Sequence, residues 1–267
     1  MNLKDDFLTT VKKMRETKPV VLHLTNMVTA ESCADMALAA GASPIMTGET
    51  AEVEELTRHA DAVVLNLGTL TEDQKDGMII AARTAKEVMI PVVLDPAGVM
   101  CSQYRLDFAL DLLNDGLVDI VRGNLSECAA LLTGVADGRG LDNKMDFARE
   151  QALKIAQEGG KKYGAVFAAT GAIDYISNGK QALVLNNGNP LLTDITGAGC
   201  MTSTLTGCCA AVAKDNFTAA ALGILIMGQS AELAANFLEK KDGPGMFKAR
   251  LMDAVYHITT KFNMLNL

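Results

Sequence analysis

Residues 62–67 read Ala62-Val63-Val64-Leu65-Asn66-Leu67, a short and almost continuously apolar run. The longer segment Thr71–Val88, with Glu72 and Asp73 near its start, has the pattern of a helix, and a second apolar run, Pro91-Val92-Val93-Leu94, follows it. A strand, a helix and a strand in this order predict a βαβ unit with parallel strands. Neither run shows the alternating polarity of a half-exposed sheet, which indicates a sheet covered on both faces.

The same alternation extends along the chain in both directions. We expect further strands at residues 20–24, 43–46, 118–121 and 165–169. We expect helices over residues 1–20, 29–40 (beginning at Thr29 or Glu31), 51–59, 71–88, 103–114, 126–132, 144–158, 200–213, 218–238 and 244–262. Extended runs at 175–177 and 181–185 flank Asn178-Gly179, a hairpin signal, so the late part of the sheet is expected to be antiparallel. The predicted class is a three-layer α/β/α fold, and the absence of a linker or repeat in the sequence favours one domain over residues 1–267.

Composition excludes several classes of partner. The 267 residues carry a formal charge of −8 and no tryptophan, which argues against a nucleic-acid partner or an anionic membrane surface. No apolar run approaches the ~20 residues of a membrane span. None of the six cysteines forms a C-x-x-C pair, so we expect reduced thiols in a cytoplasmic protein.

Polar residues follow the predicted strands directly. In parallel α/β folds ligands bind beyond the carboxyl ends of the strands, so these residues are expected to converge at one rim of the sheet. They are His23–Asn26, Gly68-Thr69, Asp95–Gly98, Arg122–Asn124 and Thr170-Gly171.

The segment Leu192–Cys200 supplies a second local signal. Gly197 and Gly199 precede the helix predicted from Cys200, and a glycine-rich turn at a helix start presents unpaired N–H groups and a positive dipole end to an anion. A helix N-terminus also tends to lower a thiol pKa. Cys200 is therefore a candidate nucleophile or base, and a plain small side chain is the alternative.

Asp95 and Glu127 form a candidate magnesium pair. Mg²⁺ is commonly held by one or two carboxylates, with waters and phosphate oxygens completing its shell. The competing interpretations are a turn residue for Asp95 and a capping-box partner of Asn124 for Glu127, a role compatible with metal binding.

Arg122 and Thr170 are candidates for contact with a nucleotide. Arginine favours forked hydrogen bonds to phosphate oxygens. For Arg122 a rim salt bridge with Asp119 or Glu127 is the alternative, and for Thr170 a plain strand-ending turn.

The run Asp194-Ile195-Thr196-Gly197-Ala198-Gly199 resembles the anion-hole motif of ribokinase-like sugar and vitamin kinases. Most of that superfamily has an aspartate, the catalytic base, after the second glycine, whereas Cys200 at this position is similar to the hydroxyethylthiazole kinase family. Other segments that resemble this family follow in the same order between about Val20 and Phe247. They are 24–29, 41–46, 65–70, 94–98, 121–124 with Glu127, and 243–247.

The resemblance implies an ATP-dependent phosphotransferase with an alcohol acceptor, the primary alcohol of 4-methyl-5-(2-hydroxyethyl)thiazole, in thiamine salvage, on a ribokinase-like fold without a separate lid domain. The roles it implies for individual residues are thiazole contact for Met46, a place beside the substrate for Gly197, ATP contact for Arg122 and Thr170, Mg²⁺ binding for Asp95 and Glu127, and the position of the base for Cys200.

The resemblance also implies a homotrimer with sites between subunits, so that Met46 and Cys200 of one site come from different chains. Three other functions remain open at this point. They are a kinase for another small alcohol such as hydroxymethylpyrimidine or a sugar, a thiol enzyme that uses Cys200 as its nucleophile, and a nucleotide-binding sensor without catalysis.

Overall fold

The computed structural model describes residues 2–137 and 149–261. In these residues the strands are β1 (Val20–Leu24), β2 (Ser43–Met46), β3 (Ala62–Asn66), β4 (Val92–Asp95), β5 (Ile120–Asn124), β6 (Val166–Thr170), β7 (Asp174–Ser177) and β8 (Ala182–Leu185). The α-helices are α1 (Leu3–Thr17), α2 (Ala30–Ala40), α3 (Thr50–Arg58), α4 (Glu72–Glu87), α5 (Gln103–Asn114), α6 (Leu125–Thr133), α7 (Arg149–Tyr163), α8 (Ala198–Ala210), α9 (Asn216–Asn236) and α10 (Pro244–Thr260). Short 3₁₀ turns lie at η1 (Val99–Cys101) and η3 (Pro190–Asp194).

One sheet contains all eight of these strands in the order β2-β1-β3-β4-β5-β6-β7-β8. The pairs from β2 to β6 are parallel, and β7 and β8 add an antiparallel edge. The expected parallel sheet and its late hairpin are both confirmed. The register sets Asn66 beside Asp95 and Asn124 beside Thr170, so the ends of β3, β4, β5 and β6 form a continuous edge.

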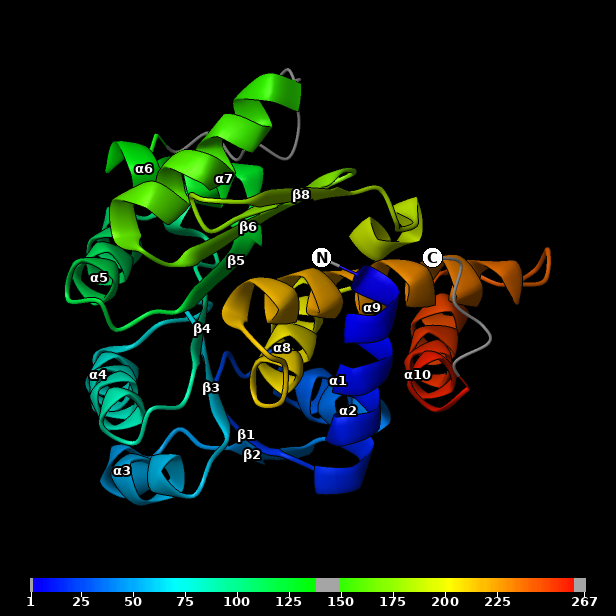
Figure 1. Cartoon of the computed structure of the whole chain (residues 1–267), viewed down its shortest axis with the longest axis horizontal. Coiled ribbons are helices and arrows are strands. Elements are labelled where there is room, and N and C mark those ends of the chain that lie inside the picture. The colour runs from blue at the N-terminus through cyan, green and yellow to red at the C-terminus, as the bar shows by residue number, and fades with distance from the viewer. Residues whose placement is uncertain (1, 138–148, 262–267) are drawn as a thin grey trace.

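Helices cover both faces of the sheet, as the continuously apolar strands predict (Figure 1). Apolar side chains of α3, α4, α5, α6 and α7 pack on one face. Those of α1, α2, α8, α9 and α10 pack on the other. The result is the expected three-layer α/β/α architecture, and the described residues form no separate lid over the sheet.

The strand expected at 118–121 begins two residues later and ends three residues later, since β5 spans Ile120–Asn124. Asp119 precedes the strand, and its side chain is held by hydrogen bonds to other elements. Its carboxylate accepts hydrogen bonds from Lys86 Nζ at 2.7 Å and from the backbone N–H of Val92 at 2.9 Å. Arg122 consequently belongs to the buried strand instead of the turn that follows it.

The helix expected at 144–158 runs further, to Tyr163. Gly159 faces the sheet so closely that a Cβ there would lie 2.4 Å from the Phe167 ring, so two consecutive glycines continue the helix where they would normally suggest its end. The expected start at 144–148 lies outside the described residues, as does Phe262, the expected end of the last helix. Most other boundaries agree to within a few residues.

Helix α9 is long and apolar enough to span a membrane, the one such helix in the described part of the chain. In the fold, however, 89% of its most apolar window is buried against the rest of the protein. Its hydrophobicity is therefore that of a central core helix, which packs beside α8 and α10 (Figure 1).

Candidate active site

The polar residues expected at one rim do come together there. Asn66, Asp95, Asn124 and Thr170 are the last residues of four adjacent strands, and Asn26 lies two residues beyond β1. Helix α8 begins over this edge, because its side chains contact Asn26, Asn66 and Asp95.

The start of α8 requires its two glycines. Gly197 has φ +89°, and a Cβ there would lie 2.7 Å from Thr29 Cγ2. A Cβ on Gly199 would lie 2.8 Å from Arg122 Nη1. No side chain caps the helix at Gly197, so the backbone N–H groups of its first turn are left for another acceptor. This is the geometry that the glycine pattern predicts for an anion site.

The Cys200 thiol sits between two amides at the rim. Asn66 Nδ2 donates to Cys200 Sγ at 3.3 Å and Asn26 Nδ2 at 3.5 Å. Burial, and then the nearby Asp95 carboxylate, raise the thiol pKa, against the smaller effects of hydrogen bonds from Thr29 and Asn26. The helix N-terminus favours a lowered thiol pKa, but the pKa of Cys200 is raised, because desolvation and the Asp95 charge both disfavour the thiolate.

Asp95 is a buried carboxylate at the end of β4. Its Oδ2 accepts a hydrogen bond from Ser203 Oγ at 2.8 Å and lies 3.8 Å from Arg122 Nη1. Burial raises the pKa of Asp95, and Arg122 opposes this shift. Asp95 is therefore the last residue of β4, and its carboxylate binds Ser203 of α8. The interpretation of Asp95 as a turn residue is wrong.

Glu127 forms the capping box that the spacing predicted. Its N–H donates to Asn124 Oδ1 at 2.9 Å, and its Oε2 accepts from the N–H of Asn124 at 2.8 Å. Oε1 accepts from the N–H of Gly98 at 3.0 Å. Burial and the Asp95 charge raise the pKa of Glu127 to about 7.

The two carboxylates fit a magnesium ion by the chemistry of their donors. They are hard oxygen ligands, buried, and close enough that the charge of Asp95 raises the pKa of Glu127, a repulsion that a divalent cation relieves. Within the described residues no group of three or more His, Cys, Asp or Glu side chains forms a metal site.

Arg122 is held by Thr170 and Asp95. Its Nη2 donates to Thr170 Oγ1 at 2.6 Å, and Thr170 Oγ1 donates in turn to the carbonyl oxygen of Gly123 at 3.2 Å. The alternative salt bridge with Asp119 or Glu127 is wrong, since the carboxylate that pairs with Arg122 is Asp95. Arg122 Nε is buried and finds no partner among the described residues.

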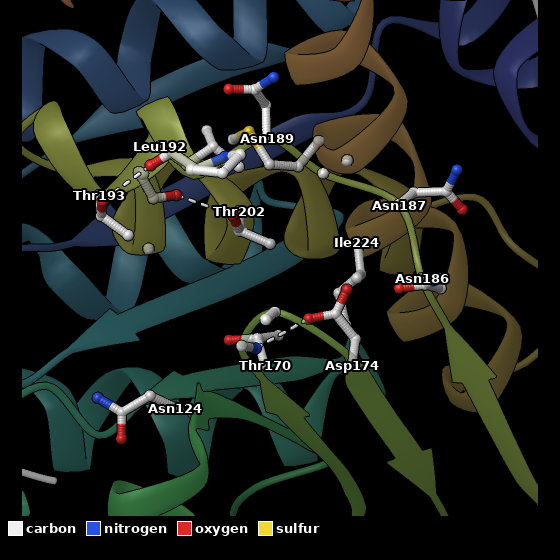
Figure 2. A pocket seen from close by; sticks show the side chains of 18 of the residues that line it. Asn124, Thr170, Asp174, Asn186, Asn187, Asn189, Leu192, Thr193, Thr202 and Ile224 are labelled. Atoms are coloured by element: carbon white, nitrogen blue, oxygen red, sulfur yellow. Dashed lines mark hydrogen bonds between the residues drawn. The ribbon is translucent and has the colours of Figure 1, made fainter. Parts of the chain in front are cut away.

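A cavity of about 600 Å³ opens beside Arg122, in the size range of small-molecule sites. Figure 2 shows Thr170 and Asp174 on one side and Leu192, Thr193 and Thr202 on the other. The remaining wall comes from Asn186–Pro190 and from Ile224, Met227 and Gly228 of α9. Arg122, Thr170 and the α8 start therefore share one cavity.

Met46 is not brought into this cavity by the single chain. It ends β2 at the outer edge of the sheet, paired with His23 of β1. The structure also adds site residues that the sequence did not single out, namely Asn66, Ser203 and Asp174. An asparagine closing an apolar strand was the available signal for Asn66. Ser203 and Asp174 carried none.

Comparison with known proteins gives one consistent result. The model of the hydroxyethylthiazole kinase family matches residues 11–261. A hydroxyethylthiazole kinase of Alkaliphilus oremlandii is 36% identical over 96% of this chain and 94% of that protein. One from a Roseiflexus species is 40% identical over 92% of this chain and 90% of that protein.

Solved structures agree. The hydroxyethylthiazole kinase protein of Pyrococcus horikoshii superposes with a TM-score of 0.85 at 35% identity, over 94% of this chain and 92% of that one. A ribokinase-like superfamily protein of Enterococcus faecalis, 13% identical, shares the fold with a TM-score of 0.64 over 97% of this chain and 89% of that one. The chain therefore has the ribokinase-like fold and belongs to the hydroxyethylthiazole kinase family.

Proposed function

We propose that this chain transfers the γ-phosphoryl group of ATP to the primary alcohol of 4-methyl-5-(2-hydroxyethyl)thiazole, at the start of α8. The observation that carries the proposal is the uncapped, glycine-bounded turn that opens onto the same cavity as Arg122 and Thr170. This arrangement joins an anion site to a space large enough for a nucleotide, and family membership supplies the reaction.

Charge neutralisation is the main task in phosphoryl transfer, because the reaction needs little covalent work from the protein. We assign to the N–H groups of the first turn of α8 and to the Arg122 guanidinium the task of stabilising charge on the phosphoryl oxygens. Asp95 and Glu127 would hold Mg²⁺, which would supply positive charge to neutralise the phosphate oxygens. Ser203 and Arg122 keep the Asp95 carboxylate oriented.

Cys200 takes the position of the base beside the anion site. Its thiol is positioned by the amides of Asn26 and Asn66, which are themselves linked by a 2.9 Å hydrogen bond. Because its pKa is raised, the resting side chain is a neutral thiol at pH 7. We assign it a modest contribution to proton removal and a larger one to positioning the alcohol.

The rival function of a thiol enzyme lacks a base. His23 is the histidine nearest the rim in sequence, but it is buried with Nδ1 3.0 Å from the carbonyl oxygen of Val21. Burial lowers its pKa to about 4. The raised pKa of Cys200 argues in the same direction, since the thiolate is the nucleophilic form.

We further propose a cytoplasmic homotrimer, each chain one domain, with the thiazole held between subunits by Met46 of one chain near Gly197 and Cys200 of another. The position of Met46 at the sheet edge supports this, as do the exposed Met27 and Val28 beside the β1 end.

The number of chains in the assembly is tested by analytical sedimentation. Mixing unfolded Met46→Asp and Cys200→Trp chains and refolding them together should restore activity if sites are shared, whereas purely additive losses would reject shared sites.

A coupled assay of ADP release tests the reaction itself. The thiazole alcohol, hydroxymethylpyrimidine and ribose are compared at equal concentrations with ATP and Mg²⁺. We expect the thiazole alcohol to give the highest kcat/KM. A preference for the pyrimidine alcohol or ribose would identify another small-alcohol kinase, and nucleotide binding without turnover on any of the three would identify a sensor.

A further inference from the structure

One buried carboxylate in the nucleotide cavity has no task in the chemistry described above. Asp174 begins β7 and is 6% exposed. Its Oδ1 accepts a hydrogen bond from the N–H of Gly171 at 3.0 Å. Among the described residues no donor reaches Oδ2, and in Figure 2 this second oxygen points into the cavity toward Ile224.

The carboxylate of Asp174 is placed to accept a hydrogen bond from a ligand in the cavity. Burial raises the pKa of Asp174 to about 6, so the group is mostly ionised at pH 7 and acts as an acceptor. Oδ2 faces the cavity with an unused acceptor site, and a donor on a ligand there would form a hydrogen bond to a charged group.

The order of groups along the cavity tells which part of a nucleotide faces Asp174. Arg122, Thr170 and Gly199 lie at the end that attracts phosphates. Ile224 and Met227 of α9 form an apolar stretch of wall that suits the flat face of a base. Asp174 stands between these two ends, beside Thr170 and below Ile224 (Figure 2).

We infer that Asp174 Oδ2 accepts a hydrogen bond from a ribose hydroxyl of the nucleotide and so makes the enzyme select ribonucleotides over deoxyribonucleotides. This inference rests on the proposed function, because it assigns ATP to the cavity. The ribose is the part of ATP that lies between phosphates and base, and its hydroxyls are donors, whereas a phosphate oxygen beside a carboxylate is repelled.

The test compares ATP with 2′-deoxy-ATP, 3′-deoxy-ATP and ITP in the wild type, Asp174→Ala and Asp174→Asn. The wild type should prefer ATP over one or both deoxynucleotides by roughly 10- to 100-fold in kcat/KM, the range for a hydrogen bond to a charged group. Both variants should lose most of that preference while the KM for the thiazole changes little. Asp215→Ala is the matched control, since Asp215 likewise accepts a backbone N–H, from Thr218 at 2.7 Å, but does not line the cavity.

Binding of ADP, 2′-deoxy-ADP, 3′-deoxy-ADP and IDP by calorimetry repeats the comparison without catalysis. A wild type that phosphorylates no alcohol yet discriminates among these diphosphates through Asp174 would refute the proposed reaction and keep this inference. Equal discrimination in wild type and Asp174→Ala would overturn the inference. The inference would also be overturned if the wild type preferred ATP to ITP and Asp174→Ala lost that preference. The partner of Asp174 would then be the adenine amine and not a ribose hydroxyl. Asp174→Asn, which keeps the side-chain shape, serves if the alanine variant is unstable by thermal unfolding.

Discussion

Replacing Cys200 gives the sharpest test of the site, because its thiol can be a base, a positioning group or both. We expect Cys200→Ala to slow phosphoryl transfer without abolishing it. The structure sets the upper limit of the loss. A positioned base contributes ~10²- to 10⁴-fold, and at an ordinary thiol pKa of about 8.5 roughly 3% of the side chain is thiolate at pH 7. Their product is a loss of roughly 3- to 300-fold, and the raised pKa of Cys200 reduces it further.

The assay is single-turnover phosphorylation of the thiazole alcohol at saturating ATP between pH 6 and 9.5. If the thiolate removes the proton, the wild-type rate should rise with pH through this range, because a raised pKa keeps the thiol protonated until high pH. Cys200→Ala should then give a flatter profile. Cys200→Ser keeps an acceptor for the amides of Asn26 and Asn66, so it separates positioning from proton transfer.

Two results would refute this reasoning. Complete loss of transfer in Cys200→Ala, with ATP binding intact, would make the thiol essential. A wild-type rate that is flat with pH and equals that of Cys200→Ser would remove the base role entirely. Protection of Cys200 from alkylation by ATP, measured by peptide mass mapping against the exposed Cys101 as an internal control, checks separately that the thiol lies at the nucleotide site.

Three further substitutions probe other parts of the site and fold. Arg122→Ala should raise the KM for ATP by ~10-fold or more and the KM for the thiazole much less, because its guanidinium lies in the nucleotide cavity; equal rises in steady-state assays would move Arg122 out of that site. Because the pKa of Glu127 is raised to about 7 without metal, the native state binds the extra proton between its ordinary pKa and 7. Stability of the metal-free protein should therefore fall as pH rises through this window and level off above it, and Glu127→Gln should flatten the dependence in denaturant titrations; an unchanged slope would contradict the assignment. Gly223→Ala should destabilise the fold by about 1–3 kcal/mol in urea unfolding without changing either KM, since a Cβ there would lie 2.6 Å from the Thr206 backbone; a neutral effect would mean that α8 and α9 separate easily.

The sequence predicts most of the fold because each local signal agrees with the sheet. Apolar runs mark the strands, and the Asn178-Gly179 turn marks the hairpin. It fails where a side chain acts outside its own element. Asp119 belongs to an apolar run by sequence, yet it binds Lys86 and the N–H of Val92. The strand therefore begins two residues later than expected, at Ile120, and includes Arg122.

The candidate site follows the same division. Gly197 and Glu127 were singled out because each sits at the start of a helix, where spacing has meaning. Arg122 was singled out because the strand was expected to end beside it, although it lies inside β5. Asp174 was not found, since its role depends on β7 lying antiparallel to β6 and placing it near Thr170, 4 residues back in sequence but on another strand. The thiazole contact of Met46 stays a proposal, because a site formed between two subunits cannot be recognised in the geometry of one chain.

Electrostatics offers a reason for a cysteine at position 200, where the motif that residues 194–199 resemble is followed by an aspartate. Asp95 and Glu127 already bring two buried carboxylates to the rim, and Asp95 raises the pKa of the thiol. A third carboxylate in Cys200→Asp would accept the same two amides but add repulsion toward Asp95. The variant should therefore be active only with more Mg²⁺ than the wild type needs, and its advantage as a base should grow as Mg²⁺ saturates. An identical Mg²⁺ dependence in the two proteins would show that Cys200 and the carboxylates do not influence each other, and the charge-balance argument would fail.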